Sequence, residues 1–174
     1  MKKLKFPSRI SIEVFKAAGA FELAKATNHK VLGIWASDCA ERVMSHFEAE
    51  YPNDHRPRNA LQELQAWIDT GKFSMHTIRR ASLDSHAAAK EIGNDSSGAS
   101  AAHSAGQAVG TAHAPIHCLG AANYALQAIY REKPDPAEAE AAVMKEREWQ
   151  LLHLRNLSEN GGNDKPSSKV LWRG

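Results

Sequence analysis

Residues 99–129 constrain the fold of this chain more than any other segment. Alanine, glycine and serine dominate the segment, and it is nearly uncharged. Alanine is the best helix former, and the composition differs from that of flexible Gly/Ser linkers. Pro115 removes an amide donor and crowds the preceding turn, so it should divide the segment into two helices or kink one. We therefore predict a central pair of alanine/glycine-rich helices whose small side chains let the backbones approach closely.

Apolar residues elsewhere recur every three or four positions, which is typical of amphipathic helices. Residues that favour helix starts and stops flank several of these runs. Asp54, Ser74 and Asp135 are placed to cap helices, while Gly71 and Gly93 are placed to end them. The predicted helices outside the central pair cover residues 12–26, 30–50, 54–71, 74–93 and 135–157.

These patterns predict an all-α fold, a single-domain bundle of about six or seven helices. The sequence shows no internal repeat, Gly-rich phosphate loop or alternating strand pattern. Its 174 residues are the usual size of one domain. We expect the helical domain to cover residues 1–157, and residues 158–174 to form a loop or loosely ordered tail.

Charge and hydropathy argue against several function classes. Lys and Arg total 22 against 20 for Asp and Glu, which gives a net charge of +2 and no strong footprint for nucleic acid. No apolar segment follows the basic start, and no run of about 18 apolar residues occurs. We therefore expect a cytoplasmic protein without a membrane or nucleic-acid partner. Cys39 and Cys118 lie in helical segments and are expected to be free thiols.

Four histidines lie in or near the small-residue core: His86, His103, His113 and His117. On a continuous helix, the last two would share one face, as a metal site needs. Pro115 lies between them, however, and no His-Glu-x-x-His or Cys-x-x-Cys motif supports a metal centre. We favour histidines held by hydrogen bonds and expect no cofactor. A metal on His103, His113 and His117 is the minor alternative.

Charged residues on three predicted helices are further candidates. Asp38 and Arg42 stand four apart beside Trp35, so they form either a pair near the apolar face or a solvated pair. Arg56 and Arg58 follow Asp54 at a helix start, where Asp38 or Asp54 is expected to bind them and lock the helices together. Glu146 interrupts an apolar stripe, so it either points inward toward a histidine or arginine or lies at the exposed edge.

The candidate polar or ligand-binding cluster therefore contains Trp35, Asp38, Arg42, Arg56, Arg58, His86, His103, His113, His117 and Glu146. No catalytic residue is assigned. Serines are abundant, but no G-x-S-x-G motif appears and no Ser/His/Asp grouping stands out.

Five blocks of the sequence carry a resemblance to a known family. In chain order they read LGIWASDCAERV, DHRPRNALQELQAWIDTGKFS, SLDSHAAAKE, AAHSAGQAVGTAHAPIHCLGAANYALQAI and EREWQLLHL. Over residues 30–157 the chain resembles the all-helical family of immunity proteins of bacterial polymorphic toxin systems. The residues that carry the resemblance are Trp35, Asp38, Cys39, Arg42, Arg56, Pro57, Arg58, Trp67, His86, His103, His113, His117 and Trp149.

The resemblance implies a non-enzymatic protein that binds and neutralises a cognate toxin made in the same cell. Occlusion of a toxin surface is the leading hypothesis. The alternative is a small-ligand or metal-binding helical protein, or an enzyme, that uses a central histidine cluster. A nucleic-acid binder would need a basic face formed by Arg56, Arg58, Arg79 and Arg80. The sequence leaves the oligomeric state and the toxin open.

Overall fold

The computed structural model describes residues 6–7, 19–93 and 95–161, and within these ranges all regular secondary structure is helical. The predicted all-α bundle is confirmed. Eight α-helices lie in the described residues, and the seven with six or more residues match the expected number. They are α2 (Phe21–Ala26), α3 (His29–Glu41), α4 (Ser45–Glu48), α5 (Arg56–Thr70), α6 (Met75–Glu91), α7 (Ser97–Gly110), α8 (His117–Glu132) and α9 (Pro136–Asn160).

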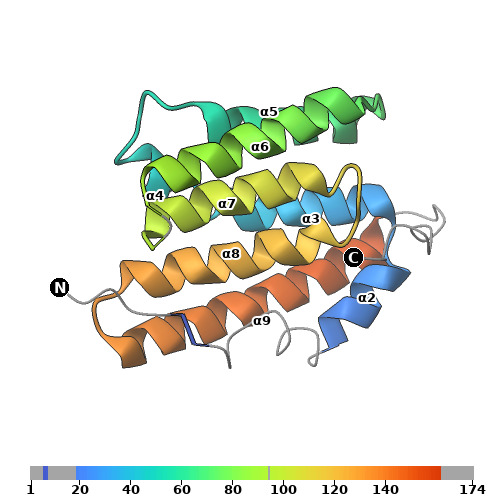
Figure 1. Ribbon diagram of the computed structural model, residues 1–174. Helices are drawn as coiled ribbons and strands as arrows, with labels where there is room; N and C mark the ends of the chain where they lie inside the picture. The colour runs from blue at the N-terminus through green and yellow to red at the C-terminus, as the bar shows by residue number, and fades with distance from the viewer. Residues whose placement is uncertain (1–5, 8–18, 94, 162–174) are drawn as a thin grey trace.

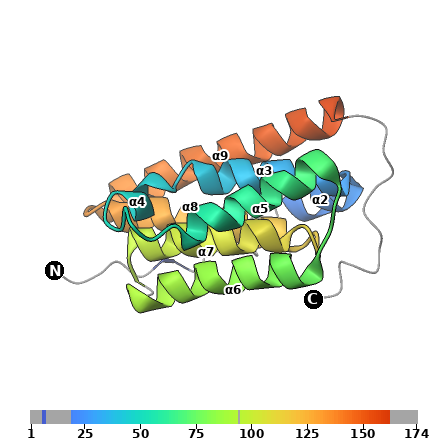
Figure 2. The same ribbon diagram turned by 90° about the horizontal axis from the view of Figure 1, so that it is seen from above.

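The helix α7 is the centre of the bundle. It packs against α3, α4, α5, α6 and α8, and 12 of its 14 residues are buried. In both views, α6 and α9 lie on opposite sides of the molecule, with α7 and α3 between them (Figures 1 and 2). The break between α7 and α8 contains Pro115, so the predicted central pair of small-residue helices is confirmed.

Serine hydroxyls link α6, α7 and α8 across their contacts. Ser85 Oγ on α6 donates to the Ala102 carbonyl on α7 at 2.7 Å, and Ser104 Oγ on α7 donates to the Ala121 carbonyl on α8 at 2.8 Å. A buried hydroxyl needs such a partner, because leaving it unpaired costs about 1 to 3 kcal/mol. These two serines therefore hold neighbouring helices in register.

Most predicted helix boundaries are confirmed by capping bonds. Ser74 and Asp135 accept backbone N–H groups at the starts of α6 and α9. Gly71 and Gly93 have positive φ angles of 67° and 89° where α5 and α6 end. The N-cap of α5 lies one position later than predicted, at His55 instead of Asp54. Asp54 Oδ1 still accepts the Arg56 N–H at 3.1 Å.

Two predicted boundaries differ from the structure. The helix expected over 30–50 is divided, because the backbone changes to i→i−3 bonds at Val43 and Met44, which ends α3 before α4 begins. At the other end, α9 continues through Asn160, where Ser158 Oγ accepts the Thr27 hydroxyl at 3.1 Å. Residues 12–18 of the first predicted helix and residues 162–174 lie outside the described residues, so the domain division at 157 stays a prediction.

The core contains the predicted cysteines as free thiols. Cys39 and Cys118 are fully buried and unpaired with each other. Burial raises the pKa of both thiols, so they act as small apolar groups. Among the described helices, none combines the length and the apolar character that crossing a membrane would require.

Candidate functional site

The predicted site residues do not form one cluster. The structure separates them into an α3–α9 cluster, a group of arginine pairs at the start of α5, a histidine pair between α6 and α7, and a second histidine pair in the α7–α8 turn. Each of these places has its own chemistry.

In the α3–α9 cluster, Arg42 pairs with Glu146. Arg42 Nε and Nη2 donate to the two carboxylate oxygens at 2.7 Å each, and the guanidinium lies 3.8 Å from the ring centroid of Trp149. Glu146 is only 6% exposed. The inward orientation of Glu146 toward an arginine is therefore as predicted. Removing one partner of such a pair is expected to be more costly than replacing both.

Asp38 does not pair with Arg42, so that prediction is wrong. Asp38 Oδ2 instead lies 2.7 Å from His153 Nε2, and the His153 ring stacks on Trp149 with centroids 4.7 Å apart. Trp35 is fully buried and donates its indole N–H to the Gln150 carbonyl at 2.8 Å. His153 was missed because its partner is 115 residues away and no local pattern connects them.

The arginines at the start of α5 bind carboxylates, and of the two expected partners Asp54 is one of them while Asp38 is not. Arg56 binds Asp54 and Glu91, which joins the start of α5 to the end of α6. Arg58 binds Glu41 and Glu48 in the same way, on the α3 and α4 side. With both guanidiniums occupied by carboxylates, this group does not form the basic face that a nucleic-acid binder would need.

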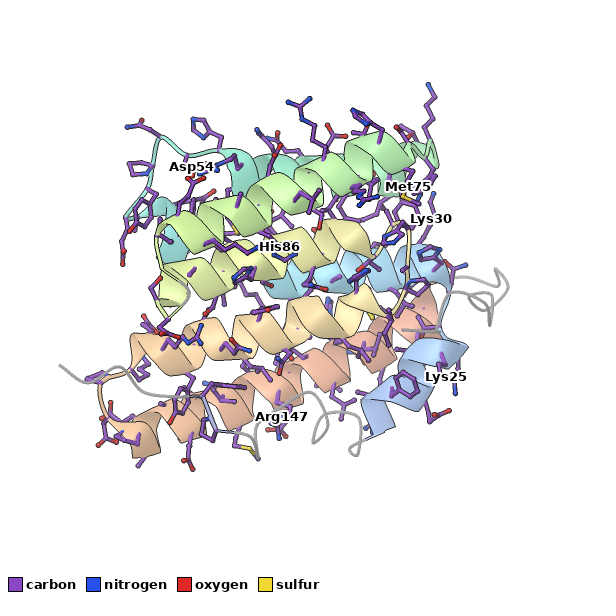
Figure 3. All side chains as sticks on the ribbon, in the orientation of Figure 1. Lys25, Lys30, Asp54, Met75, His86 and Arg147 are labelled. Carbon is purple, nitrogen blue, oxygen red and sulfur yellow. The ribbon has the colours of Figure 1, made fainter. Side chains whose placement is uncertain are left out.

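His86 and His103 share a hydrogen bond between their Nδ1 atoms, at 2.8 Å. One Nδ1 atom must donate a hydrogen and the other must accept it. The two rings therefore cannot both be positively charged imidazolium ions while the bond lasts. Burial lowers the pKa of both, to about 4 for His103. His86 reaches from α6 toward α7 (Figure 3), where Gly106 leaves room for its ring. His86 and His103 are thus held by a hydrogen bond, which is the interpretation favoured in the sequence analysis.

His113 and His117 form the second pair, with ring centroids 5.2 Å apart. His113 Nδ1 lies 2.9 Å from the Gly110 carbonyl oxygen, and His117 Nδ1 lies 2.7 Å from Gln107 Oε1. Burial lowers the pKa of His117, and the charge of His113 lowers it further. Because the chain leaves the helical path between them, the pair is set by the turn and not by a shared helix face.

A pocket of about 390 Å³ opens beside this second pair. Its apolar side comes from the first half of α6, and its polar side comes from the α7–α8 turn. The residues that line it are Met75, Ile78, Arg79, Ser82, Leu83, Gly110, His113 and His117. Met75, labelled in Figure 3, is the first residue of α6. We call this cavity the α6 pocket.

A second, more polar hollow of about 380 Å³ lies toward the other end of α6. It is lined by Lys90, Asp95, His103, Tyr124, Gln127 and Arg131. Arg131 donates to Ser100 Oγ at 2.7 Å and lies 3.6 Å from Asp95, so its charge is already engaged by the protein. His103 therefore lines this hollow, whereas His113 and His117 line the α6 pocket.

The described residues contain no group of three or more His, Cys, Asp or Glu side chains arranged to hold a metal ion. His103 and the pair of His113 and His117 lie in different hollows, so the three metal candidates do not converge. The geometry supports hydrogen bonding and packing at these sites.

Exposed apolar side chains gather at the α6 pocket. Five large hydrophobic residues among the described residues are exposed: Phe73, Met75, Leu83, Met144 and Leu152. The first three lie on α6 or just before it, and Met75 and Leu83 line the pocket. We call Phe73, Met75, Arg79 and Leu83 the α6 face.

Comparison with known proteins identifies a family and no individual relative. No curated protein and no solved structure matches the chain. A family model described as Imm-5 like putative immunity protein matches residues 22–157. The match begins slightly earlier than the resemblance seen in the sequence and ends at the same residue. It spans α3 to α8, most of α9 and all four histidines. The chain belongs to the Imm-5 like putative immunity protein family.

Proposed function

We propose that this protein binds a cognate toxin in the cytoplasm and neutralises it by occlusion, through the α6 face. The observation that carries the proposal is that exposed Met75 and Leu83 line one pocket, with exposed Phe73 two residues before Met75. Family membership supports a toxin as the partner.

The α6 face has the composition of a protein interface. Contiguous exposed apolar side chains are unfavourable in water and mark interaction sites when they surround a hollow. Methionine, phenylalanine and arginine are all enriched at interfaces, and Arg79 supplies the charged member here. A partner that covers this face would remove the apolar side chains from water and gain about 25 cal/mol for each Å² buried.

Occlusion requires complementary shape and charge but no chemical step. The described side chains fit that requirement, since the histidines are engaged in hydrogen bonds and no nucleophile and base are paired. Arg79 makes the rim of the pocket positive, so an acidic group on the toxin would steer association and help to exclude other partners.

Co-expression tests the function and the surface together. The cognate toxin is expressed with the wild-type protein, with Leu83→Asp or with Leu152→Asp. Leu83 is 58% exposed and Leu152 is 55% exposed, so both variants place a carboxylate at an equally accessible position. We expect Leu83→Asp to lose protection and Leu152→Asp to keep it, because only the first introduces an unpaired charge into the α6 face.

Two outcomes of this experiment would contradict the proposal. Equal protection by both variants would exclude the α6 face as the contact surface. Failure of the wild-type protein to protect cells against the co-expressed toxin would contradict the immunity function itself. Circular dichroism of each purified variant checks that lost protection does not reflect unfolding.

A small-ligand or metal-binding protein remains the second candidate, because each of the two hollows is lined by histidine. Mass spectrometry and elemental analysis of untagged protein test it. A stoichiometric small molecule or metal, together with no protection by the wild-type protein, would favour this candidate over immunity.

A further inference from the structure

We infer that the α6 pocket is an anchor site for one aromatic side chain of the toxin that carries an N–H or O–H donor, namely tyrosine or tryptophan. The inference rests on the proposed function, because it names what the partner inserts at the centre of the α6 face.

The polar wall of the pocket presents hydrogen-bond acceptors. The Gly110 carbonyl oxygen and Gln107 Oε1 can only accept, so the Nδ1 atoms of His113 and His117 that face them must carry the hydrogens. In a neutral imidazole the other nitrogen, Nε2, then carries a lone pair. Burial keeps the pKa of His117 below its ordinary value, which favours this neutral form.

On this inference, both Nε2 atoms face the pocket that the two rings line. Within the described part of the chain, neither makes a hydrogen bond, and neither is sealed from solvent as an unpaired buried atom. Each ring is also fixed in orientation by its Nδ1 bond, so little freedom is lost when a donor binds.

Two glycines make room for this arrangement. A Cβ atom at Gly110 would lie 3.2 Å from His117 Cγ, and one at Gly120 would lie 2.5 Å from Gln107 Oε1. Any larger residue at either position would push the imidazole or the amide that orients it. The acceptor wall therefore depends on contacts specific to this part of the fold.

The opposite wall selects an apolar ring. Met75, Ile78 and Leu83 supply aliphatic contacts, and Arg79 supplies a cation that can lie against an aromatic face. Ser82 Oγ already donates to the Gly106 carbonyl at 2.8 Å, so toward the pocket it can still accept.

These walls discriminate between classes of ligand. A carboxylate would meet imidazole lone pairs, and an alkyl chain would leave them unpaired. A phenol or an indole satisfies both walls at once, and a volume of about 390 Å³ is at the small end of ligand pockets. Buried tyrosine and tryptophan anchors are also the side chains that most often dominate interface energy.

Small aromatic probes test the pocket without the toxin. The wild-type protein, labelled with ¹⁵N, is titrated with indole, p-cresol and toluene, and the histidine ring ¹⁵N resonances are followed by NMR. We expect indole and p-cresol to shift the Nε2 resonances of His113 and His117 in a saturable way. Toluene has nearly the shape of p-cresol without the donor, so it should bind at least about fivefold more weakly.

A variant assigns the effect to the acceptor wall. His117→Phe should reduce the preference for p-cresol over toluene, because only the His113 acceptor remains, while His76→Phe, an exposed α6 residue outside the α6 pocket, should leave both affinities unchanged. If His117→Phe fails to fold, the difference between p-cresol and toluene on the wild-type protein still decides the question. Equal affinities for these two probes, or no saturable shift with any probe, would overturn the inference.

Toxin binding separates this inference from the proposed function. If Leu83→Asp abolishes protection but no probe binds, the α6 face is correct and the aromatic anchor is wrong. If p-cresol binds with the expected preference but Leu83→Asp still protects, the pocket serves a free aromatic molecule, and the toxin anchor is wrong. The α6 face and the aromatic anchor are both supported if p-cresol binds more tightly than toluene and competes with the toxin for the protein.

Discussion

At the scale of single residues, Gly106 and His86 depend on each other. A Cβ atom at position 106 would lie 2.9 Å from His86 Cε1 and 3.0 Å from Nε2. The ring cannot move away easily, because its Nδ1 atom is bonded to His103. The glycine is thus retained at a helix interior where alanine would otherwise be favoured by about 1 kcal/mol.

We predict that Gly106→Ala has opposite effects in two backgrounds. With His86 present, the added methyl group should lower the free energy of unfolding by about 1 to 3 kcal/mol, as overpacking does. In a His86→Ala background, the same change should raise it by up to about 1 kcal/mol, because only helix propensity remains. Urea unfolding of the four proteins measures both values, and the same sign in both backgrounds would contradict the predicted contact.

The histidine pair also predicts how stability changes with pH. Burial lowers the pKa of His103 from 6.5 to about 4, with the charges of His86, Lys90 and Arg131 contributing. The unfolded chain therefore takes up a proton near pH 6.5 that the folded chain takes up only near pH 4. Stability should fall as the pH drops through this window, and it is fully present above it.

The measurement compares melting temperatures at pH 7 and pH 5. We expect a smaller decrease for His103→Asn than for the wild-type protein, because the variant lacks the group that titrates differently in the two states. His76→Asn, which changes an exposed histidine of α6, should behave like the wild-type protein. A decrease in His103→Asn equal to that of the wild type would rule out His103 as the source.

At the scale of helices, local signals predict where elements begin and end. Ser74 and Asp135 cap because their side chains reach amides two or three residues ahead, and Gly71 ends α5 with a positive φ. Pro115 breaks the small-residue segment because its ring removes the backbone N–H and crowds the preceding turn. These effects act over a few residues, so the sequence alone determines them.

Partners that are far apart in the sequence could not be predicted in the same way. Arg42 and Asp38 looked like an i,i+4 pair, yet Arg42 binds Glu146 across 104 positions and Asp38 contacts His153 across 115. Glu146 on α9 accepts from two N–H groups of the Arg42 guanidinium in a bidentate pair, which a neighbouring aspartate on the same helix does not match. The choice depends on how α3 and α9 pack.

The histidines show the same limit. The sequence places them in or near the small-residue segment, but it could not divide them into two pairs. The division arises because α6 supplies His86 opposite His103, while the turn after Gly110 turns His113 and His117 toward the start of α6.

At the scale of the whole molecule, the central position of α7 predicts cooperative unfolding. Because α7 packs against five other helices, removing it would expose part of every one of them. We expect urea unfolding curves from circular dichroism and tryptophan fluorescence to coincide, since Trp35, Trp67 and Trp149 report from α3, α5 and α9. Two separate midpoints would show that part of the bundle unfolds independently.

The contrast between α7 and the outer side of α6 has an evolutionary consequence. On α7, 12 of 14 residues are buried among neighbouring backbones, so almost any enlargement there would be selected against. On α6, Arg79 and Leu83 are exposed, and substitutions there leave the core unaltered. Descendants of this protein could therefore come to bind a different partner through substitutions on the exposed side of α6, while the sequence of α7 stays nearly unchanged.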